Sequence, residues 1–323
     1  MNKMSYNFML DVGGTCIKAG IFDGRGKLYK NSIYSFEARA QAGAEEILEN
    51  FVEILRTLAD VLPASTEEIE GLAMAFPGPF EYESGVSRMK NIGKYDALYG
   101  IPIEPEIRKR FFASAGRTRM TESCRFLFCN DVEAFAMGES RFGQAQTWRK
   151  VMYLCMGTGA GSAFSENCRI LRGGDRNDVP ENGWIYPTPF RESIIDDYLS
   201  IRGLEKLAER YLGERKSGKE LFSLCRQGNQ AALKVYREFG TWFREAIVPY
   251  LDSFAPDGFV LGGQLAKSFA YFGGEFSKAC RQREIEICLA ADTSRRIMDG
   301  LYLALQNPAV FPCLDSKRKS CGK

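Results

Sequence analysis

Two glycine-rich segments, each between apolar runs typical of strands, could bind phosphate. In the first, LDVGGTCIK, an apolar run ends at Asp11 and is followed by Gly13, Gly14 and Thr15. Glycines let backbone N–H groups approach a phosphate closely, and a neighbouring carboxylate or hydroxyl can serve the phosphate and its Mg²⁺. A glycine pair is also a favoured hairpin turn, so this segment alone leaves a plain turn as the alternative.

The second segment, CMGTGAGSA, repeats the arrangement of strand, turn and strand, with the turn at Gly157, Thr158 and Gly159. Two such hairpins could hold a polyphosphate from two sides, and we predict that they face each other across a cleft. Neither is a P-loop, because G-x-x-x-x-G-K-[ST] does not occur in the sequence. A dinucleotide-binding pattern is disfavoured, since strand-like rather than helical residues follow.

An Asn–Asp pair, Asn130 and Asp131, stands at the end of a third apolar run and directly before a helical stretch. Ligands of open α/β sheets bind at the carboxyl ends of strands. A carboxylate there can accept the proton of a substrate hydroxyl as it attacks phosphorus, a step that contributes about 10²–10⁴-fold. Asn and Asp are also preferred helix N-caps, so capping and catalysis both stay open, alone or together.

Weaker signals come from two turns and two loop residues. The turn around Gly78, in FPGP, is either a chain reversal or the lining of a ligand pocket. Gly262 and Gly263 lie between a buried strand and a helix, where they either admit a nucleobase or permit close packing. Asn91 and Glu181 fall in loops, where polar residues are usually solvated.

The apolar periodicity predicts the same order of elements twice. The first copy has strands over 6–12, 16–22 and 28–36, a helix over 44–62, and strands over 71–76 and 125–129 that lead into a helix ending near 142. The second has strands over 151–156, up to 164 and near 170, helices that end with 229–254, strands over 258–261 and 285–289, and a helix over 292–306. We therefore predict an α/β fold, duplicated internally, with lobes of residues 1–128 and 129–323 joined tightly around a cleft.

Composition excludes several classes of protein. A chain of 323 residues is about twice a typical domain. Lys and Arg number 43 against 41 Asp and Glu, interspersed along the chain, so no electrostatic argument supports nucleic acid or membrane as a partner. Histidine is absent, which excludes Ser-His-Asp catalysis and histidine-containing metal sites.

The ten cysteines indicate a reducing compartment. They include no C-x-x-C pair, and most fall in apolar runs, which is typical of buried thiols. The start of the sequence is unlike a signal peptide, and no apolar stretch approaches the ~18 residues of a membrane span. We expect a cytoplasmic protein.

Taken in order, these segments resemble the ROK family of sugar kinases, within the actin-like superfamily. The resemblance runs from LDVGGTCIK through AMAFPGPF, NDVEAFAMGE, MGTGAG and FVLGGQLAKS to RRIMDGLYLAL, nearly the whole chain. It implies a two-lobed actin-like (ribonuclease-H-like) fold whose last helix, near 292–306, returns to the first lobe. It also implies ATP-dependent phosphorylation of a hexose or hexose derivative, with Mg²⁺ and a homodimer.

The resemblance gives each matched residue a role. It implies that Asp131, in the second lobe, is the general base, and that the sugar contacts are Gly78, Asn91, Asn130, Asp131, Glu181 and Asp196. It implies that the nucleotide and its phosphates contact Asp11, Gly13, Gly14, Thr15, Gly157, Thr158, Gly159, Gly262 and Gly263. Asp11 would also hold Mg²⁺ through water.

Two departures from the family pattern concern the sugar. Trp184 stands where the family has a histidine, and the following stretch, PTPFRESIIDDYLS, lacks the cysteines of the family's zinc loop, so we predict no zinc site. Asp196 is one methylene shorter than the family's glutamate. Glucose specificity is therefore not inherited, and Trp184 either packs beside the sugar or belongs to the core. A sugar-sensing protein without activity and a polyphosphate-using glucokinase remain alternatives.

Overall fold

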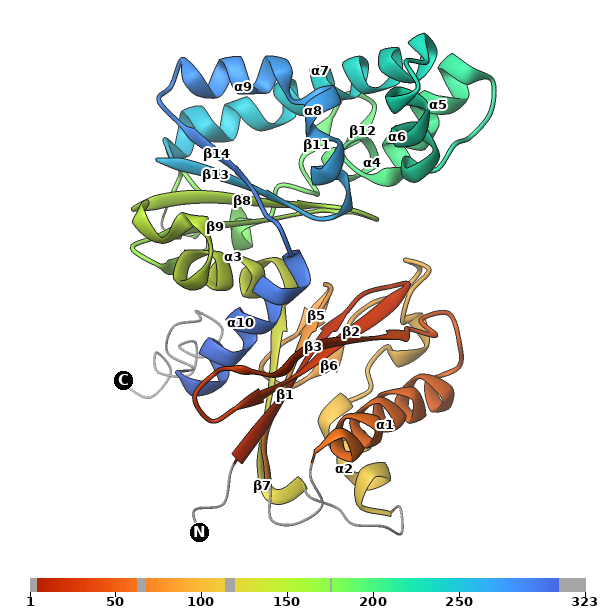
Figure 1. Cartoon of the computed structure of the whole chain (residues 1–323), viewed down its shortest axis with the longest axis vertical. Helices are drawn as coiled ribbons and strands as arrows, with labels where there is room; N and C mark the ends of the chain where they lie inside the picture. The colour runs from red at the N-terminus through yellow and green to blue at the C-terminus, as the bar shows by residue number, and fades with distance from the viewer. Residues whose placement is uncertain (1–4, 63–67, 114–119, 175, 308–323) are drawn as a thin grey trace. The chain divides into compact units, whose positions relative to one another are not determined.

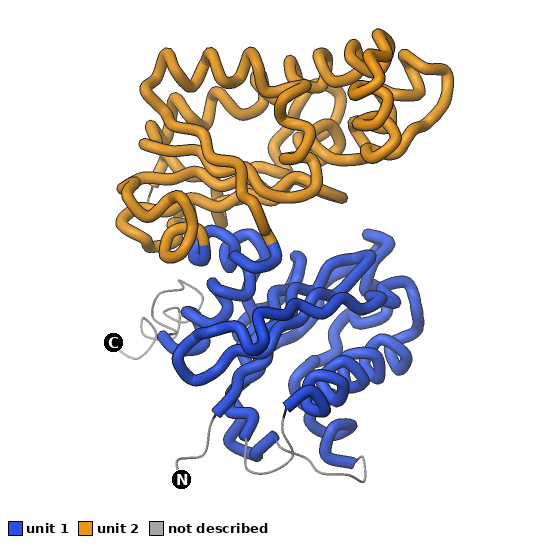
Figure 2. The backbone as a smooth tube through the Cα atoms, viewed as in Figure 1, with its two compact units in different colours: residues 1–138, 294–323 blue, residues 139–293 orange. Residues whose placement is uncertain are grey.

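The chain forms two compact units, which Figure 2 colours separately. The computed structural model describes residues 5–62, 68–113, 120–174 and 176–307. Unit 1 takes the chain up to Gly138 and again from Ser294, and unit 2 takes Glu139–Thr293. The chain therefore leaves unit 1 later than the boundary at 128 that the sequence suggests, and Asp131 lies in unit 1 rather than in the second lobe.

Unit 1 is built on a five-stranded sheet of order β3-β2-β1-β4-β7 (Figure 1). Strands β1, β2 and β3 pair antiparallel, whereas β4 and β7 continue the sheet in parallel with β1. The strands of unit 1 are β1 Ser5–Val12, β2 Cys16–Asp23, β3 Leu28–Glu37, β4 Glu68–Phe76, β5 Phe80–Glu81, β6 Val86–Ser87 and β7 Met120–Asn130. Its helices are α1 Ala44–Val61, η1 Asp96–Leu98, α2 Ile103–Ala113, α3 Asp131–Phe142, which ends in unit 2, and α10 Thr293–Gln306, which begins there.

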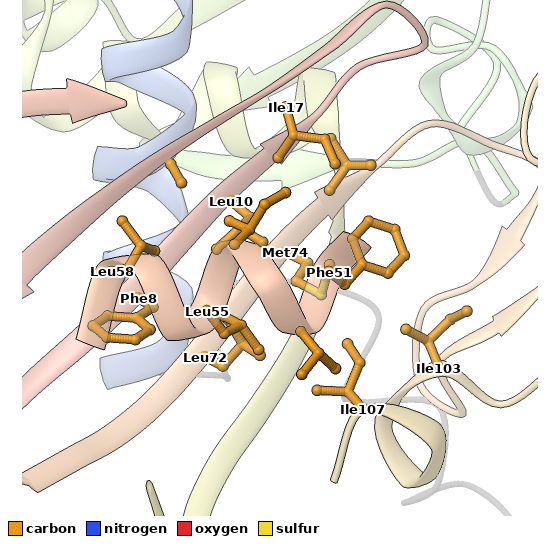
Figure 3. Close-up of a cluster of buried hydrophobic side chains, with 14 of the residues drawn as sticks. Phe8, Leu10, Ile17, Phe51, Leu55, Leu58, Leu72, Met74, Ile103 and Ile107 are labelled. Carbon is orange, nitrogen blue, oxygen red and sulfur yellow. The ribbon is translucent and has the colours of Figure 1, made fainter. Parts of the chain in front are cut away.

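Helix α1 covers one face of this sheet because its apolar residues recur at helical spacing. Figure 3 shows Phe51, Leu55 and Leu58 of α1 lying against residues of β1 and β4 such as Leu10 and Met74. All five of these side chains are fully buried. Burying a side chain of this size stabilises the fold by about 1.5–3 kcal/mol, so this layer fixes the strands whose ends carry the candidate site.

Helices α3 and α10 pack unusually closely in unit 1. A Cβ atom on Gly138 of α3 would lie 1.9 Å from the carbonyl oxygen of Arg296, and Gly300 of α10 meets the backbone of Ala134 in the same way. Only glycine permits this approach, because backbone atoms cannot rotate away from an added methyl group. The contact keeps the first two turns of α3 with unit 1, which is why the boundary falls beyond residue 128.

Unit 2 repeats the architecture with a sheet of order β10-β9-β8-β13-β14. Its strands are β8 Lys150–Met156, β9 Ala160–Glu166, β10 Arg169–Leu171, β11 Pro189–Phe190, β12 Ser193–Ile194, β13 Gly258–Gly262 and β14 Glu286–Leu289. Its helices are η2 Gln144–Thr147, η3 Glu181–Gly183, α4 Ile195–Tyr198, α5 Ile201–Leu212, α6 Gly218–Arg226, α7 Gln230–Phe254, η4 Gln264–Ser268, α8 Phe269–Phe272 and α9 Gly274–Arg281. The long helix α7 begins after Asn229, whose side chain accepts the N–H of Ala232 at 3.0 Å.

The two sheets have the same strand order, with an antiparallel meander of three strands followed by two parallel strands. This confirms the predicted α/β fold and its internal duplication. The predicted elements are confirmed to within a few residues, and β7 begins earlier than expected, at Met120. No disulfide joins the cysteines in the described part of the chain, and Cys313 and Cys321 lie outside it. None of the described helices is long and apolar enough to cross a membrane.

Candidate functional site

The first glycine turn closes the hairpin between β1 and β2. The N–H of Gly13 donates to the carbonyl oxygen of Cys16 at 3.1 Å, and a Cβ atom on Gly13 would come within 2.7 Å of that oxygen. The turn is therefore tight because its first residue is glycine. Gly14 and Thr15 are exposed at the tip of the turn.

Asp11, at the end of β1, is held from α10. The hydroxyl of Ser294 donates to Oδ2 of Asp11 at 2.7 Å and accepts from the ammonium of Lys18, the cross-strand partner of Asp11, at 2.9 Å. Asp11 is half-buried. Mg²⁺ typically keeps several waters and is bound by one or two carboxylates together with substrate phosphates. A single oriented carboxylate beside a glycine turn fits that mode of binding.

Asn130 ends β7 and caps α3. Its Oδ1 accepts the backbone N–H groups of Val132 at 3.0 Å and Glu133 at 3.2 Å, the hydrogen bonds of an N-cap. Its Nδ2 donates to the hydroxyl of Tyr82 at 3.1 Å. The capping interpretation is thus confirmed for Asn130.

Asp131 is half-buried at the first position of α3. Its Oδ1 accepts the N–H of Val132 at 3.0 Å, and among the described residues its Oδ2 has no hydrogen-bond partner. Burial raises the pKa of this carboxyl above its usual value, while the nearby Lys94 and the N–H of Val132 oppose that shift. A carboxylate with a raised pKa and an unused oxygen is suited to accept a proton.

Tyr82 connects the turn at Gly78 to Asn130 and Asp131. The Tyr82 hydroxyl donates to the carbonyl oxygen of Phe76, at the end of β4, and a Cβ atom on Gly78 would be 3.5 Å from that hydroxyl. Burial and the charge of Asp131 raise the pKa of Tyr82 well above its usual value, so the hydroxyl stays protonated and can donate. Tyr82 therefore ties the FPGP turn to the ends of β4 and β7.

Asn91 opens a loop that reaches the first hairpin. Asn91 is exposed, with a left-handed backbone at φ 60°. Four residues later Tyr95 is fully buried, and its hydroxyl donates to the carbonyl oxygen of Gly13 at 2.8 Å. Between them, Lys94 lies over Gly14, because a Cβ atom on Gly14 would be 3.2 Å from Cδ of Lys94.

The second glycine turn, in unit 2, is held by helices α4 and α5. The carbonyl oxygen of Gly157 accepts the N–H of Ile201, and the carbonyl oxygen of Thr158 accepts from the guanidinium of Arg202 at 3.0 Å. The N–H of Gly157 donates to the carbonyl oxygen of Gly159 at 2.9 Å, which closes the turn. Thr158 is exposed.

Asp196 supports this second turn with both carboxylate oxygens. Oδ1 accepts the N–H of Ala160 at 2.7 Å, and Oδ2 accepts from Arg202. A Cβ atom on Gly159 would approach Oδ1 to 2.8 Å, so glycine is needed at that position. These partners favour a role for Asp196 in holding the turn over the sugar contact that the resemblance implies.

The second glycine pair lies next to the second turn. Gly262 pairs with Cys155 in the register of β13 and β8. Gly263 has φ 85°, and a Cβ atom on it would collide with the backbone of Met156. The N–H of Gly263 donates to the hydroxyl of Thr293 at 3.0 Å. Close packing is thus one confirmed reason for glycine at Gly263.

Glu181 is exposed in η3, at the edge of a loop tied to β9. Ser162 of β9 donates to the carbonyl oxygen of Gly183 and accepts the N–H of Ile185 at 3.0 Å. Trp184 is half-buried, with its ring 5.8 Å from that of Tyr186. The described residues include no group of three or more His, Cys, Asp or Glu that could hold a metal ion.

The predicted site residues thus fall into two groups. Unit 1 brings together the first hairpin, Asp11, Gly78, Asn130 and Asp131, with Asn91 opening the loop that reaches the hairpin. Unit 2 brings the second hairpin, Gly262, Gly263 and Asp196 together. Sequence reasoning missed Tyr82 and Lys94, which lie in loops, and Ser294, which lies in the first turn of α10; no periodic pattern marks any of them. Their one sequence signal was proximity to FPGP, Asn91 and the last helix.

Fold and site together describe an actin-like chain with a glycine hairpin in each unit and a carboxylate at a strand end. A family model described as "ROK family" matches residues 8–284, and the chain belongs to that family. This confirms the resemblance predicted from the sequence.

Similar proteins include several sugar kinases. The chain is 26% identical over 291 residues to an N-acetyl-D-glucosamine kinase of Haemophilus influenzae, covering 84% of this chain and 87% of that protein. It is 23% identical over 279 residues to a glucokinase of Thermotoga maritima, covering 80% and 82%. A ROK family glucokinase of Streptomyces griseus, solved with glucose and AMPPNP, has the same fold, with a TM-score of 0.68, 19% identity and coverage of 93% and 99%.

Proposed function

We propose that this chain is a sugar kinase that transfers the terminal phosphoryl group of ATP to a hydroxyl of a hexose or hexose derivative. The observation that carries the proposal is that Asn130 and Asp131, at the start of α3, have different hydrogen-bonding roles. Asn130 supplies the helix cap, and Asp131 keeps an oxygen without a partner among the described residues. Membership of the ROK family and the names of the curated relatives support a sugar as the acceptor.

In this proposal Asp131 accepts the proton of the attacking hydroxyl. Burial raises its pKa, which makes it a stronger base than a solvated aspartate. Asn130, the turn at Gly78 and Asn91 would orient the sugar so that one hydroxyl faces Asp131. Tyr82 holds Asn130 and the turn at Gly78 in place, because it accepts a hydrogen bond from Asn130 and donates one to the carbonyl oxygen of Phe76.

The phosphoryl group passes through a loose transition state with charge spread over its oxygens, so catalysis depends on positioning and on compensating that charge. The turn of Gly13, Gly14 and Thr15 would lie beside the transferred group, and Gly157, Thr158 and Gly159 would lie beside the rest of the triphosphate. Mg²⁺, when bound, compensates phosphate charge, and Asp11 would hold it through water. Gly262 and Gly263 would lie beside the adenosine.

The test is ADP formation by the purified chain with a panel of hexoses and N-acetylated amino sugars. We expect ADP formation that one class of sugar stimulates well above the rate without sugar. Asp131→Asn should lower kcat by at least about 10²-fold while sugar binding persists. Asp60→Asn, which removes an exposed carboxylate of α1, is the matched control and should leave kcat unchanged.

The outcomes separate the parts of the proposal. Absence of sugar-stimulated ADP formation across the panel would overturn the kinase. Near-normal turnover by folded Asp131→Asn would overturn only the assignment of the base. The homodimer, the cytoplasmic location and the lack of nucleic-acid, membrane and zinc partners remain predictions.

A further inference from the structure

Lys94 belongs to a loop whose backbone is fixed on both sides. The carboxylate of Asp96 accepts the N–H groups of Ile92 at 3.1 Å and Gly93 at 3.0 Å. The N–H of Tyr95 donates to the carbonyl oxygen of Ala40 at 2.6 Å. A residue between two such anchors has a defined direction, so the position of Lys94 follows from the loop.

The side chain of Lys94 extends from this loop over the first glycine turn. Its Cδ would be 3.2 Å from a Cβ atom on Gly14, which places the aliphatic part over the backbone of the turn. Lys94 is also the charged side chain that acts on the Asp131 carboxyl. Among the described residues its ammonium has no hydrogen bond or ion pair, although the side chain is half-buried.

A half-buried lysine that lies over a glycine turn and has no hydrogen bond or ion pair among the described residues requires an explanation. Lysine side chains carry substantial rotamer entropy and are usually extended into water unless a partner holds them. Here the turn at Gly14 contacts the aliphatic stem, but none of the described residues accepts a hydrogen bond from the ammonium. An anionic ligand at the turn would supply that acceptor.

We propose that Lys94 is a catalytic residue that donates from its ammonium to an oxygen of the transferred phosphoryl group. This inference rests on the proposed kinase function and adds to it a group that neither the motifs nor the relatives' names identify. The sugar oxygen bonds to the terminal phosphorus as the bond from that phosphorus to the bridging oxygen of ADP breaks. The hydroxyl proton goes to Asp131, and Lys94 remains protonated throughout.

The charge of Lys94 serves both negative groups that meet in this step. A phosphoryl group approaching ionised Asp131 is repelled by it, and a cation beside both reduces that repulsion. Hydrogen bonds from an ammonium to phosphate are stronger than those between neutral groups. We therefore expect the ammonium to strengthen the binding of ATP, which carries the terminal phosphate, relative to ADP, which lacks it.

The alternative is that Lys94 acts only on Asp131, as a positioning residue. The two roles differ in how they affect nucleotide binding. A contact with the transferred group strengthens the binding of ATP and not of ADP, since only ATP carries that group. A residue acting only through Asp131 changes neither nucleotide's affinity.

The experiment measures the Kd of Mg-ATP and of Mg-ADP, without sugar, together with kcat in the presence of the stimulating sugar. The variants are Lys94→Met, which keeps the stem and removes the charge, and Lys94→Arg, which keeps the charge. Lys90→Met is the matched control from the same loop. It removes the same charge, but the Lys90 ammonium lies over the ring of Tyr99, 5.5 Å from its centroid, and is therefore engaged elsewhere. Thermal unfolding of each variant shows that it is folded.

We expect Lys94→Met to weaken ATP binding at least about tenfold, with ADP binding changed less than about twofold, and to lower kcat at least about tenfold. Lys94→Arg should recover part of both losses, and Lys90→Met should match the wild type. An unchanged ratio of ATP to ADP affinity in folded Lys94→Met would overturn the assignment. The two proposals can fail separately. If the wild type consumes no ATP with any sugar, the proposed kinase function is wrong. If Lys94→Met nevertheless loses the preference for ATP over ADP, the contact between Lys94 and the terminal phosphate is still supported.

Discussion

The closest helix contact in unit 1 gives a sharp test of the packing argument. At Gly300 of α10, an added Cβ atom would lie 1.8 Å from the carbonyl oxygen of Ala134 in α3. Ordinary contact begins at 3.4 Å, so Gly300→Ala requires the two helices to separate by about 1.6 Å at this point. Neither partner can relieve the overlap by changing a rotamer, because the clashing oxygen is backbone.

The cost follows from what this separation disturbs. Met298 and Leu301, on either side of Gly300, are fully buried, so moving α10 loosens contacts on both sides. Overpacking costs about 1–3 kcal/mol, and a clash between backbone atoms belongs at the upper end of that range. Alanine recovers about 1 kcal/mol of helix propensity relative to glycine. The net expectation for Gly300→Ala is a loss of about 2 kcal/mol, which corresponds to a Tm lower by about 4–8 °C.

Thermal and urea unfolding of the purified chain measure this change. Gly274→Ala is the matched control, because Gly274 opens helix α9 with no atom within 4 Å of its added Cβ. We expect this control to leave the Tm unchanged or slightly raised. A Gly300→Ala variant that melts at or above the wild-type temperature would refute the reasoning that α3 and α10 depend on glycine for their approach.

Two further predictions concern the candidate site. Because burial raises the pKa of Asp131, and a protonated carboxyl cannot accept a proton, kcat/KM should fall with decreasing pH at a pH above the usual aspartate pKa. Lys94→Met should move this fall to still higher pH, since the charge of Lys94 opposes the upward shift of the Asp131 pKa. The charge of Asp131 also acts on Tyr82, as do those of Glu133 and Cys129. An unmoved profile would contradict the assignment. Asp196→Asn should raise the KM of ATP about three- to tenfold and more than that of the sugar, because Asp196 holds the second turn. A rise confined to the KM of the sugar would instead favour the direct sugar contact that the resemblance implies.

The repeated elements were predictable because they depend on local patterns. Apolar residues at helical spacing along α1 and α7, and apolar runs ending in glycine turns, predict these elements whichever tertiary contacts they make. Asn130 and Asp131 were found for the same reason, since a polar pair directly after an apolar run marks the end of a buried strand. The family resemblance then supplied roles that the pattern left open.

The residues that sequence reasoning missed depend on contacts across the chain. The position of Lys94 is set by the anchoring of Tyr95 to Gly13 and Ala40, far away in the sequence. The hydroxyl of Ser294 reaches Asp11 because α10 packs in unit 1. The periodicity of apolar residues does not predict such long-range contacts. The unit boundary was missed likewise, because the close approach of Gly138 to Arg296 is a property of two helices and of neither sequence alone.

The two units repeat one glycine hairpin in different surroundings. Both sheets provide a turn at the same place in the strand order, but the supports of the two turns differ. The turn at Gly157 is held by Arg202, whose guanidinium is already engaged by Thr158 and Asp196. The turn at Gly13 is held by the neutral hydroxyl of Tyr95. Lys94, which lies over the same turn, has no hydrogen bond or ion pair among the described residues. A cation that is already engaged supports structure, whereas one without a hydrogen bond or ion pair is available to a ligand. Within the proposed reaction, we therefore expect the first hairpin rather than the second to contact the transferred phosphoryl group.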